Sequence, residues 1–230
     1  DIHISSIQAH DLDVGVIARV GGMGQIEGCA RIEGPTLTQI SMYGILEHSA
    51  AAGSIFGPKA GFETEINLTV TPTTLDFYAA GDVILSAALV DLEASATAHL
   101  FFDFAMGVAE GELFGHVNCD AAVAGLSGDG QLTWHISPTM QYLQGRLKVG
   151  VISPIVSGGL EGGFFIGNNV PNALAWVLDP TDSHFGMSRS ILPATLTGVY
   201  GYGQASIGFN AYVLGGGVDI WAGAGAFSAP

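Results

Sequence analysis

The chain has 230 residues, of which 48% are hydrophobic and 12% are charged, and its formal net charge is −15 at pH 7. This acidic excess makes nucleic acid and anionic lipid poor partners. No run approaches the roughly 20 consecutive apolar residues of a membrane-spanning helix, so the hydrophobic content must lie in shorter elements, and membrane insertion is not the expected state.

Alternation of apolar and polar residues with period two dominates the chain and predicts β-strands along most of it. Gly, Pro, Asn and Asp residues punctuate this pattern and indicate turns. Several of the predicted strands exceed the usual length of roughly five or six residues, which indicates long ribbons or bent strands. The strands are expected at residues 13–20, 24–33, 36–46, 61–70, 74–90, 91–104, 108–124, 131–136, 146–156, 161–167, 194–213 and 218–227.

The predicted fold class is therefore all-β. We expect a long antiparallel meander that forms stacked sheets, as a sandwich or as open sheet layers, in one β-rich domain over residues 1–230, with a subdivision near residues 125–130 as the alternative. At most two or three short helices are expected. Proline can occupy a first helical turn after Ser137 and at Pro171, and an alanine run favours a weaker third helix over Ile45–Ala52.

The clearest two-faced segment runs from Leu85 to Asp120. If Met106–Gly107 forms its turn, residues whose numbers sum to 213 face each other, which pairs Asp103 with Glu110 and His99 with Phe114. One face is then polar. The other is built mostly from small or apolar residues, and its shallow alanine surface suits close packing against another sheet: Leu92, Ala94, Ala96, Ala98, Leu100, Phe102 and Phe104.

The polar face of this segment holds a candidate metal site. Imidazole and carboxylate groups of His99, Asp103, Glu112 and His116 are suitable ligands for a divalent cation. A solvated polar face is the plainer interpretation, because the register sets the two imidazoles diagonally. Asp11–Asp13 could also hold calcium, although the glycine and glutamate of an EF-hand are missing. A divalent cation such as calcium is the one cofactor that these residue types suggest.

The segment from residue 194 onward has almost no charge and carries an aromatic face. Tyr200, Tyr202, Tyr212 and Trp221 could line a groove for a sugar or a lipid, or could form a cross-strand ladder inside a protected sheet. The alternating Gly and Ala residues of Trp221–Phe227 resemble the sheet-forming crystalline segments of silk, which supports closely stacked sheets.

Cys29 and Cys119 lie far apart in the sequence, and both lie in predicted strands. They form either a disulfide, within or between chains, or two buried free thiols. The chain opens with Asp1 and lacks a basic-then-apolar leader, which suits a secreted protein whose signal peptide has been removed. We therefore expect an extracellular or cell-surface location, which Asn67-Leu68-Thr69, a match to a glycosylation acceptor, also suits.

No nucleophile elbow, phosphate loop or positioned acid and base pair appears in the chain, so no catalytic residue is assigned and an enzyme is not expected. Scarce charge and small-residue faces favour a structural, self-assembling sheath, surface-layer or fibre subunit whose partners are copies of itself. A β-barrel or sandwich that binds lipid or another apolar ligand is the alternative, with an outer-membrane-type barrel as its relative. A hydrolase or lyase using His and carboxylate groups is a third hypothesis without an assembled site.

Overall fold

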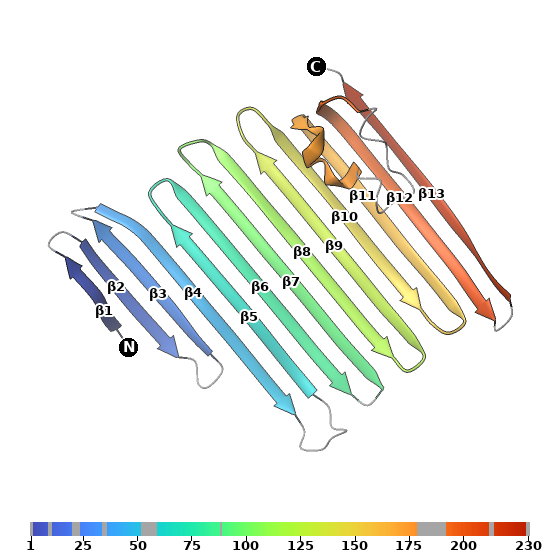
Figure 1. Ribbon diagram of the computed structural model, residues 1–230, viewed down its shortest axis with the longest axis horizontal. Coiled ribbons are helices and arrows are strands. Elements are labelled where there is room, and N and C mark those ends of the chain that lie inside the picture. Colours follow the sequence, from blue (N-terminus) through green and yellow to red (C-terminus); the bar gives the residue numbers. More distant parts are fainter. Residues whose placement is uncertain are drawn as a thin grey trace.

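In the computed structural model, the described residues form a single antiparallel sheet of 13 strands, in which each strand pairs with its neighbours in the sequence and β1 and β13 are the edges (Figure 1). The structure describes residues 2–8, 11–19, 24–33, 36–51, 59–87, 89–178, 192–211 and 214–228. The all-β antiparallel meander is thereby confirmed. Of the two arrangements expected, the described residues form an open layer and not a sandwich.

The strands are long, as their alternation predicts, and most of their ladders continue almost to a short turn, whereas residues 172–194 join β11 to β12. Their bounds in chain order are β1 Ile2–Gln8, β2 Asp11–Arg19, β3 Gly24–Glu33, β4 Thr36–Ala51, β5 Lys59–Val70, β6 Thr74–Ala87, β7 Val90–Asp103, β8 Val108–Ala121, β9 Ala124–Ile136, β10 Gln141–Ile152, β11 Val156–Pro171, β12 Thr195–Ala211 and β13 Leu214–Ser228. Strand β9 pairs with β8 and β10 through residues 125–130, so the ladder crosses that region without a break.

Two of the three expected helices are wrong, and one exists as two short turns. Pro171 is followed by the 3-10 turns η1 (Asn172–Leu174) and η2 (Trp176–Leu178). Ser137 instead closes the β9–β10 hairpin, because its hydroxyl donates to the Met140 carbonyl at 3.0 Å and accepts from the Met140 N–H at 3.1 Å. Residues 45–51 belong to β4, where pairing with β5 outweighs the helix preference of alanine.

The predicted register of the β7–β8 hairpin is wrong by two residues. Its loop covers residues 104–107, and the Asp103 carboxylate accepts hydrogen bonds from the N–H groups of Ala105 and Met106, both at 2.9 Å. His99 therefore lies opposite Glu112 instead of Phe114, and Asp103 lies opposite Val108. A shift of two residues preserves the side on which every side chain lies, so the predicted faces of this hairpin are correct.

A small core lies over β11 and β12 beneath the two 3-10 turns. Gln144 of β10 is buried beside it, and its side-chain amide donates to the Leu174 carbonyl at 2.8 Å. Much of the sheet elsewhere has no second layer among the described residues (Figure 1). The core consists of Phe165, Val170, Ala175, Val177, Leu178, Leu196, Tyr200 and Tyr202.

Candidate functional site

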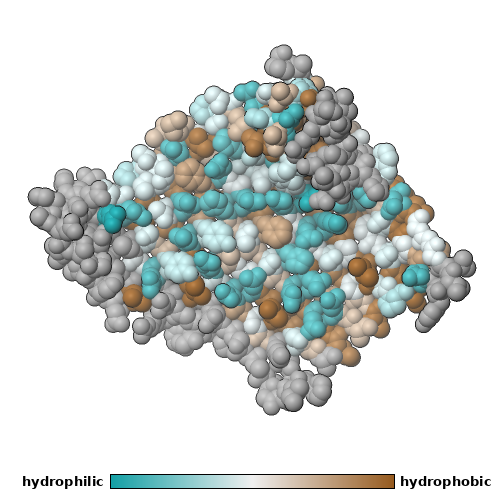
Figure 2. Space-filling model, in the orientation of Figure 1, coloured by the Kyte–Doolittle hydropathy of each residue, from teal (hydrophilic) through white to brown (hydrophobic). Residues whose placement is uncertain are grey.

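The candidate site is the sheet itself, because its two faces differ completely in charge. Residues paired across neighbouring strands share a face and successive residues alternate, so the ladders assign each residue of β5–β13 to one side. Every charged side chain that the structure describes in these strands lies on one side, from Glu63 in β5 to Asp219 in β13. We call this side the polar face and the opposite side the apolar face. Figure 2 shows polar side chains running across the polar face.

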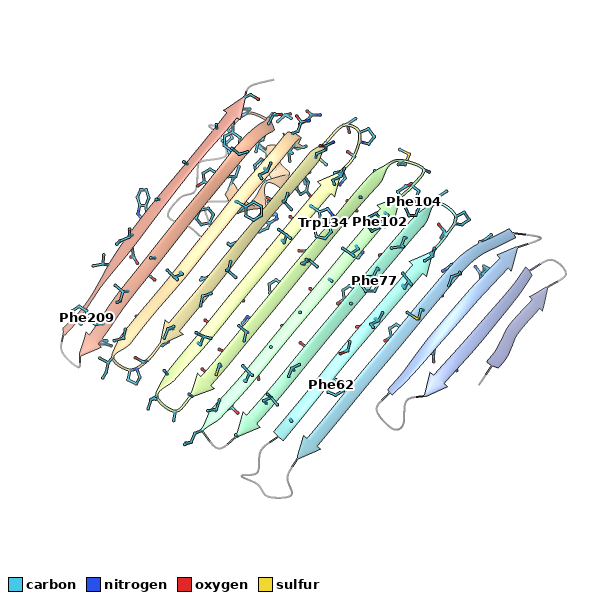
Figure 3. All side chains as sticks on the ribbon, turned by 180° about the vertical axis from the view of Figure 1, so that it is seen from behind. Phe62, Phe77, Phe102, Phe104, Trp134 and Phe209 are labelled. Atoms are coloured by element: carbon cyan, nitrogen blue, oxygen red, sulfur yellow. The ribbon has the colours of Figure 1, made fainter. Side chains whose placement is uncertain are left out.

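The apolar face carries large hydrophobic side chains that are open to solvent. Leu160 is 63% exposed, Ile207 is 62% exposed and Leu147 is 60% exposed. Figure 3 views this side and shows Phe62, Phe77, Phe102, Trp134 and Phe209 across it. The shallow surface predicted for the segment Leu85–Asp120 lies at the middle of β7, at Ala94, Ala96 and Ala98, and large side chains stand on the apolar face of the strands farther away.

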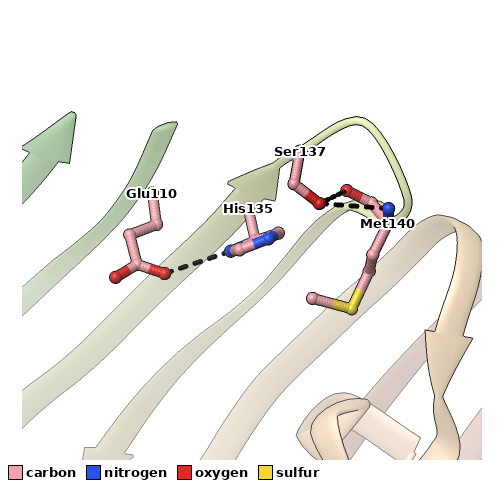
Figure 4. Close-up of polar contacts among 4 residues, drawn as sticks. All are labelled: Glu110, His135, Ser137 and Met140. Atoms are coloured by element: carbon pink, nitrogen blue, oxygen red, sulfur yellow. Dashed lines mark hydrogen bonds and ion pairs between the residues drawn. The ribbon is translucent and has the colours of Figure 1, made fainter. Parts of the chain in front are cut away.

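The polar face holds three pairs in which a histidine meets a carboxylate on a neighbouring strand. His99 Nε2 lies 2.8 Å from Asp76 Oδ1, and His116 Nδ1 lies 2.6 Å from Asp129 Oδ1. The third pair joins His135 Nδ1 to Glu110 Oε2 at 3.0 Å (Figure 4). These contacts tie neighbouring strands together along the polar face.

The four residues predicted to bind a metal are not brought together. His99 and His116 engage different carboxylates, and Glu112 accepts a hydrogen bond from the Gln131 amide at 2.8 Å. Asp103 instead caps the β7–β8 turn. Within the ranges that the structure describes, no group of three or more His, Cys, Asp or Glu side chains could hold a metal ion. The side chains of Asp11–Asp13 lie outside the described part.

A shallow concavity of about 300 Å³ does form on the polar face around His99. Its walls come from four neighbouring strands, β5 to β8, because residues on the same face and in register lie side by side. The lining residues are Asn67, Thr69, Asp76, Tyr78, Thr97, His99 and Glu112. Hydrogen-bonding groups line the concavity, and its single imidazole, that of His99, is already paired with the Asp76 carboxylate.

Two of the four residues of the predicted aromatic face, Tyr200 and Tyr202, belong to the small core. The rings of Tyr200 and Tyr202 are buried with centroids 6.1 Å apart, and the Tyr202 hydroxyl donates to Glu161 Oε1 at 2.8 Å. Burial raises the pKa of Tyr202, and the hydrogen bond to Glu161 raises it further. Trp221 is 54% exposed on the edge strand β13, and Tyr212 lies outside the described residues.

Sequence reasoning missed the polar side chains that hold η2 against the sheet. The Trp176 indole N–H donates to the Thr133 hydroxyl at 2.9 Å, and the Arg146 guanidinium lies 5.7 Å from the Trp176 ring centroid. Trp176 follows Pro171 closely in the sequence, but Thr133 and Arg146 come from β9 and β10. Only the register of the sheet brings these three residues together, and no local pattern signals it.

The two cysteines do not meet within the chain. Cys29 lies in β3 and Cys119 lies in β8, with four strands between them, and Cys119 is a free thiol. Five strand spacings of about 4.8 Å separate the two backbones by about 24 Å, which is far beyond the reach of a disulfide. The intrachain disulfide is therefore wrong, and a disulfide between chains stays a prediction.

No family model, curated protein or solved structure matches the chain. In the ranges that the structure describes, no helix is long and apolar enough to cross a membrane.

Proposed function

We propose that the chain is a structural subunit that assembles with copies of itself at the cell surface or outside the cell. The observation that carries this proposal is the separation of all described charge in β5–β13 from an apolar face that is open to solvent. Soluble monomers rarely expose apolar patches larger than roughly 300–600 Å². A face this wide therefore needs a cover, and a second apolar face of the same kind supplies one.

The polar face supports the same proposal because it suits contact with water. Four of its carboxylates, those of Asp76, Glu110, Glu112 and Asp129, contact histidines or the Gln131 amide on neighbouring strands within the chain. Stacking through the apolar faces would leave these groups in water and would bury no charged side chain of β5–β13. Burial of apolar area is the main favourable term in protein association, whereas burial of unpaired charge opposes it.

A second candidate function is that lipid hydrocarbon covers the apolar face. The observation that favours it is the length of the apolar runs, such as alternate residues from Val90 to Phe102 in β7, together with the large side chains now seen on this face. A strand that crosses hydrocarbon needs about 9–11 residues. Trp134 and Phe102 near the strand ends would suit the interface with water (Figure 3).

Two neighbouring substitutions in β7 test the proposed function. Ala96 lies on the apolar face and Thr97 on the polar face, so Ala96→Glu introduces a carboxylate into the proposed contact and Thr97→Glu does not. Size-exclusion chromatography and negative-stain microscopy should show assemblies for the wild type and Thr97→Glu, and none for Ala96→Glu. A wild-type chain that stays monomeric without lipid and copurifies with lipid in native mass spectrometry would contradict self-assembly and support the second candidate.

A further inference from the structure

Two neighbouring rows of residues cross the middle of the apolar face, perpendicular to the strands. The first row, here called the furrow row, runs through Gly115, Gly130, Leu147 and Gly162 of β8 to β11. The second, here called the ridge row, runs through Leu113, Leu132, Gly145 and Phe164 of the same strands. In each strand the two rows are two residues apart, so they lie side by side on the same face.

The ridge row is the furrow row with large and small residues exchanged. Three strands place a glycine in the furrow row and a large side chain in the ridge row, whereas β10 does the reverse with Leu147 and Gly145. Leu113 is 40% exposed and Phe164 is 38% exposed, so both present surface on this face. At Gly145 the neighbouring Leu132 and Phe164 side chains lean over the glycine, with Leu132 Cδ1 and Phe164 Cε1 each 3.0 Å from where a Cβ would lie. The match between the two rows therefore rests on the open glycines of the furrow row, which are Gly115, Gly130 and Gly162.

We propose that a second copy of the chain covers the apolar face by stacking on it about a two-fold axis that runs across the strands between these two rows. This inference rests on the proposed function and names its partner and geometry. The axis places each strand over a reversed copy of itself, which sets the ridge row of one chain over the furrow row of the other. In β8 it sets Leu113 over the partner's Gly115. The contact is isologous, as two-fold interfaces must be.

The same axis matches residues outside the two rows. In β12 it sets Val199 over the partner's Ala205, whereas the Trp134 ring of β9 already lies over Gly111 of its own chain. Beyond β11 the furrow continues through Gly203 and Ala222, and the apolar face there is hollowed by a concavity of about 500 Å³. Large side chains thus face small ones along several strands, which is how two sheets interdigitate at about 10 Å separation.

The area of the face is sufficient for a stable dimer. Nine strands, β5 to β13, at about 4.8 Å spacing and about ten residues of 3.3 Å rise give a plane of roughly 1,400 Å². Stable interfaces bury about 800 Å² per partner. Because none of the charged side chains described in β5–β13 lies on this face, stacking desolvates none of them, and the polar faces stay outward. A lipid cover, in contrast, would not require the side-chain sizes of the furrow row to match those of the ridge row.

Three variants of β8 test this geometry by sedimentation velocity over a concentration series without lipid or detergent. The nearest atom that a Cβ at Gly115 would meet is the Ser95 carbonyl oxygen at 3.9 Å, so Gly115→Leu fits within one chain. It sets Leu against Leu113 of the other copy and should weaken association about ten- to a hundredfold. Leu113→Ala should weaken association by leaving a gap. The double variant Leu113→Ala/Gly115→Leu exchanges the two sizes and should recover most of the wild-type affinity.

The recovery in the double variant is specific to an axis between the two rows. If the wild type assembles and the double variant is as weak as either single variant, the proposed axis is wrong while self-assembly stands. If the wild type does not assemble at all, the proposed function fails together with its geometry. Far-UV circular dichroism of all three variants confirms that each compared chain is folded.

Discussion

Replacing Leu196 by alanine should destabilise the chain far more than the same replacement at Leu160. Leu196, the second residue of β12, has no exposed surface and belongs to the small core, whereas Leu160 is 63% exposed on the apolar face. Truncation of a fully buried leucine costs about 2.7–5 kcal/mol, because transfer free energy is lost and a cavity remains. Leu160 has little burial to lose within one chain, and at about 0.8 kcal/mol per buried methylene its truncation should cost about 1 kcal/mol or less.

Urea unfolding followed by circular dichroism measures both losses. The measurement is made at several low chain concentrations and extrapolated to the monomer, so that association does not add to the stability of either variant. Equal losses for Leu196→Ala and Leu160→Ala would refute the placement of the core beneath η1 and η2. They would mean that the apolar face is already covered within a single chain.

Three further outcomes follow from the described contacts. Asp103→Ala removes the acceptor for two backbone N–H groups of the β7–β8 turn and should cost about 1 kcal/mol in urea unfolding, whereas Asp103→Asn should retain most of the stability. The pKa of Tyr202 in the folded chain lies above its ordinary value of 10.0. The unfolded chain therefore loses the Tyr202 hydroxyl proton at a lower pH than the folded chain does. The protonated Tyr202 hydroxyl therefore contributes to stability below pH 10, and this contribution is lost as the pH rises above 10. Ultraviolet titration should show that Tyr202 ionises at a lower pH in Glu161→Gln than in the wild type. An unchanged titration curve would contradict the assigned contact between Tyr202 and Glu161. Cys119 is a free thiol on the apolar face, so maleimide should label it more slowly in assembled wild-type chain than in Ala96→Glu, as peptide mass spectrometry can measure; equal rates would count against a covered face.

The period-two pattern predicts the meander and the two faces, because side-chain alternation is a local property of a strand. It does not predict the register where a loop is longer than its turn residues suggest. At the β7–β8 hairpin the Asp103 cap extends the loop to four residues, 104–107, and moves every predicted pair by two positions. The faces survive this error because two is the period of the strand.

The interpretation of glycines as turns fails for a related reason. Gly128 and Gly130 surround Asp129 in a typical turn sequence, yet all three lie inside β9, where each glycine is paired with residues of β8 and β10. The small size of Gly130 becomes meaningful only when the neighbouring strands are in register, because Gly130 then forms part of the furrow row. The metal set failed for the same cause: His99 and His116 share a face, but their carboxylate partners come from β6 and β9, which the sequence of one hairpin does not contain.

Sedimentation equilibrium of the wild-type chain in buffer without lipid or detergent tests the central claim, that a second copy covers the apolar face. One chain has a mass of 23.6 kDa. We predict a mass of twice this value or a higher even multiple, with dissociation to monomers in Ala96→Glu. A single species of 23.6 kDa at micromolar concentration, unchanged by Ala96→Glu, would contradict it.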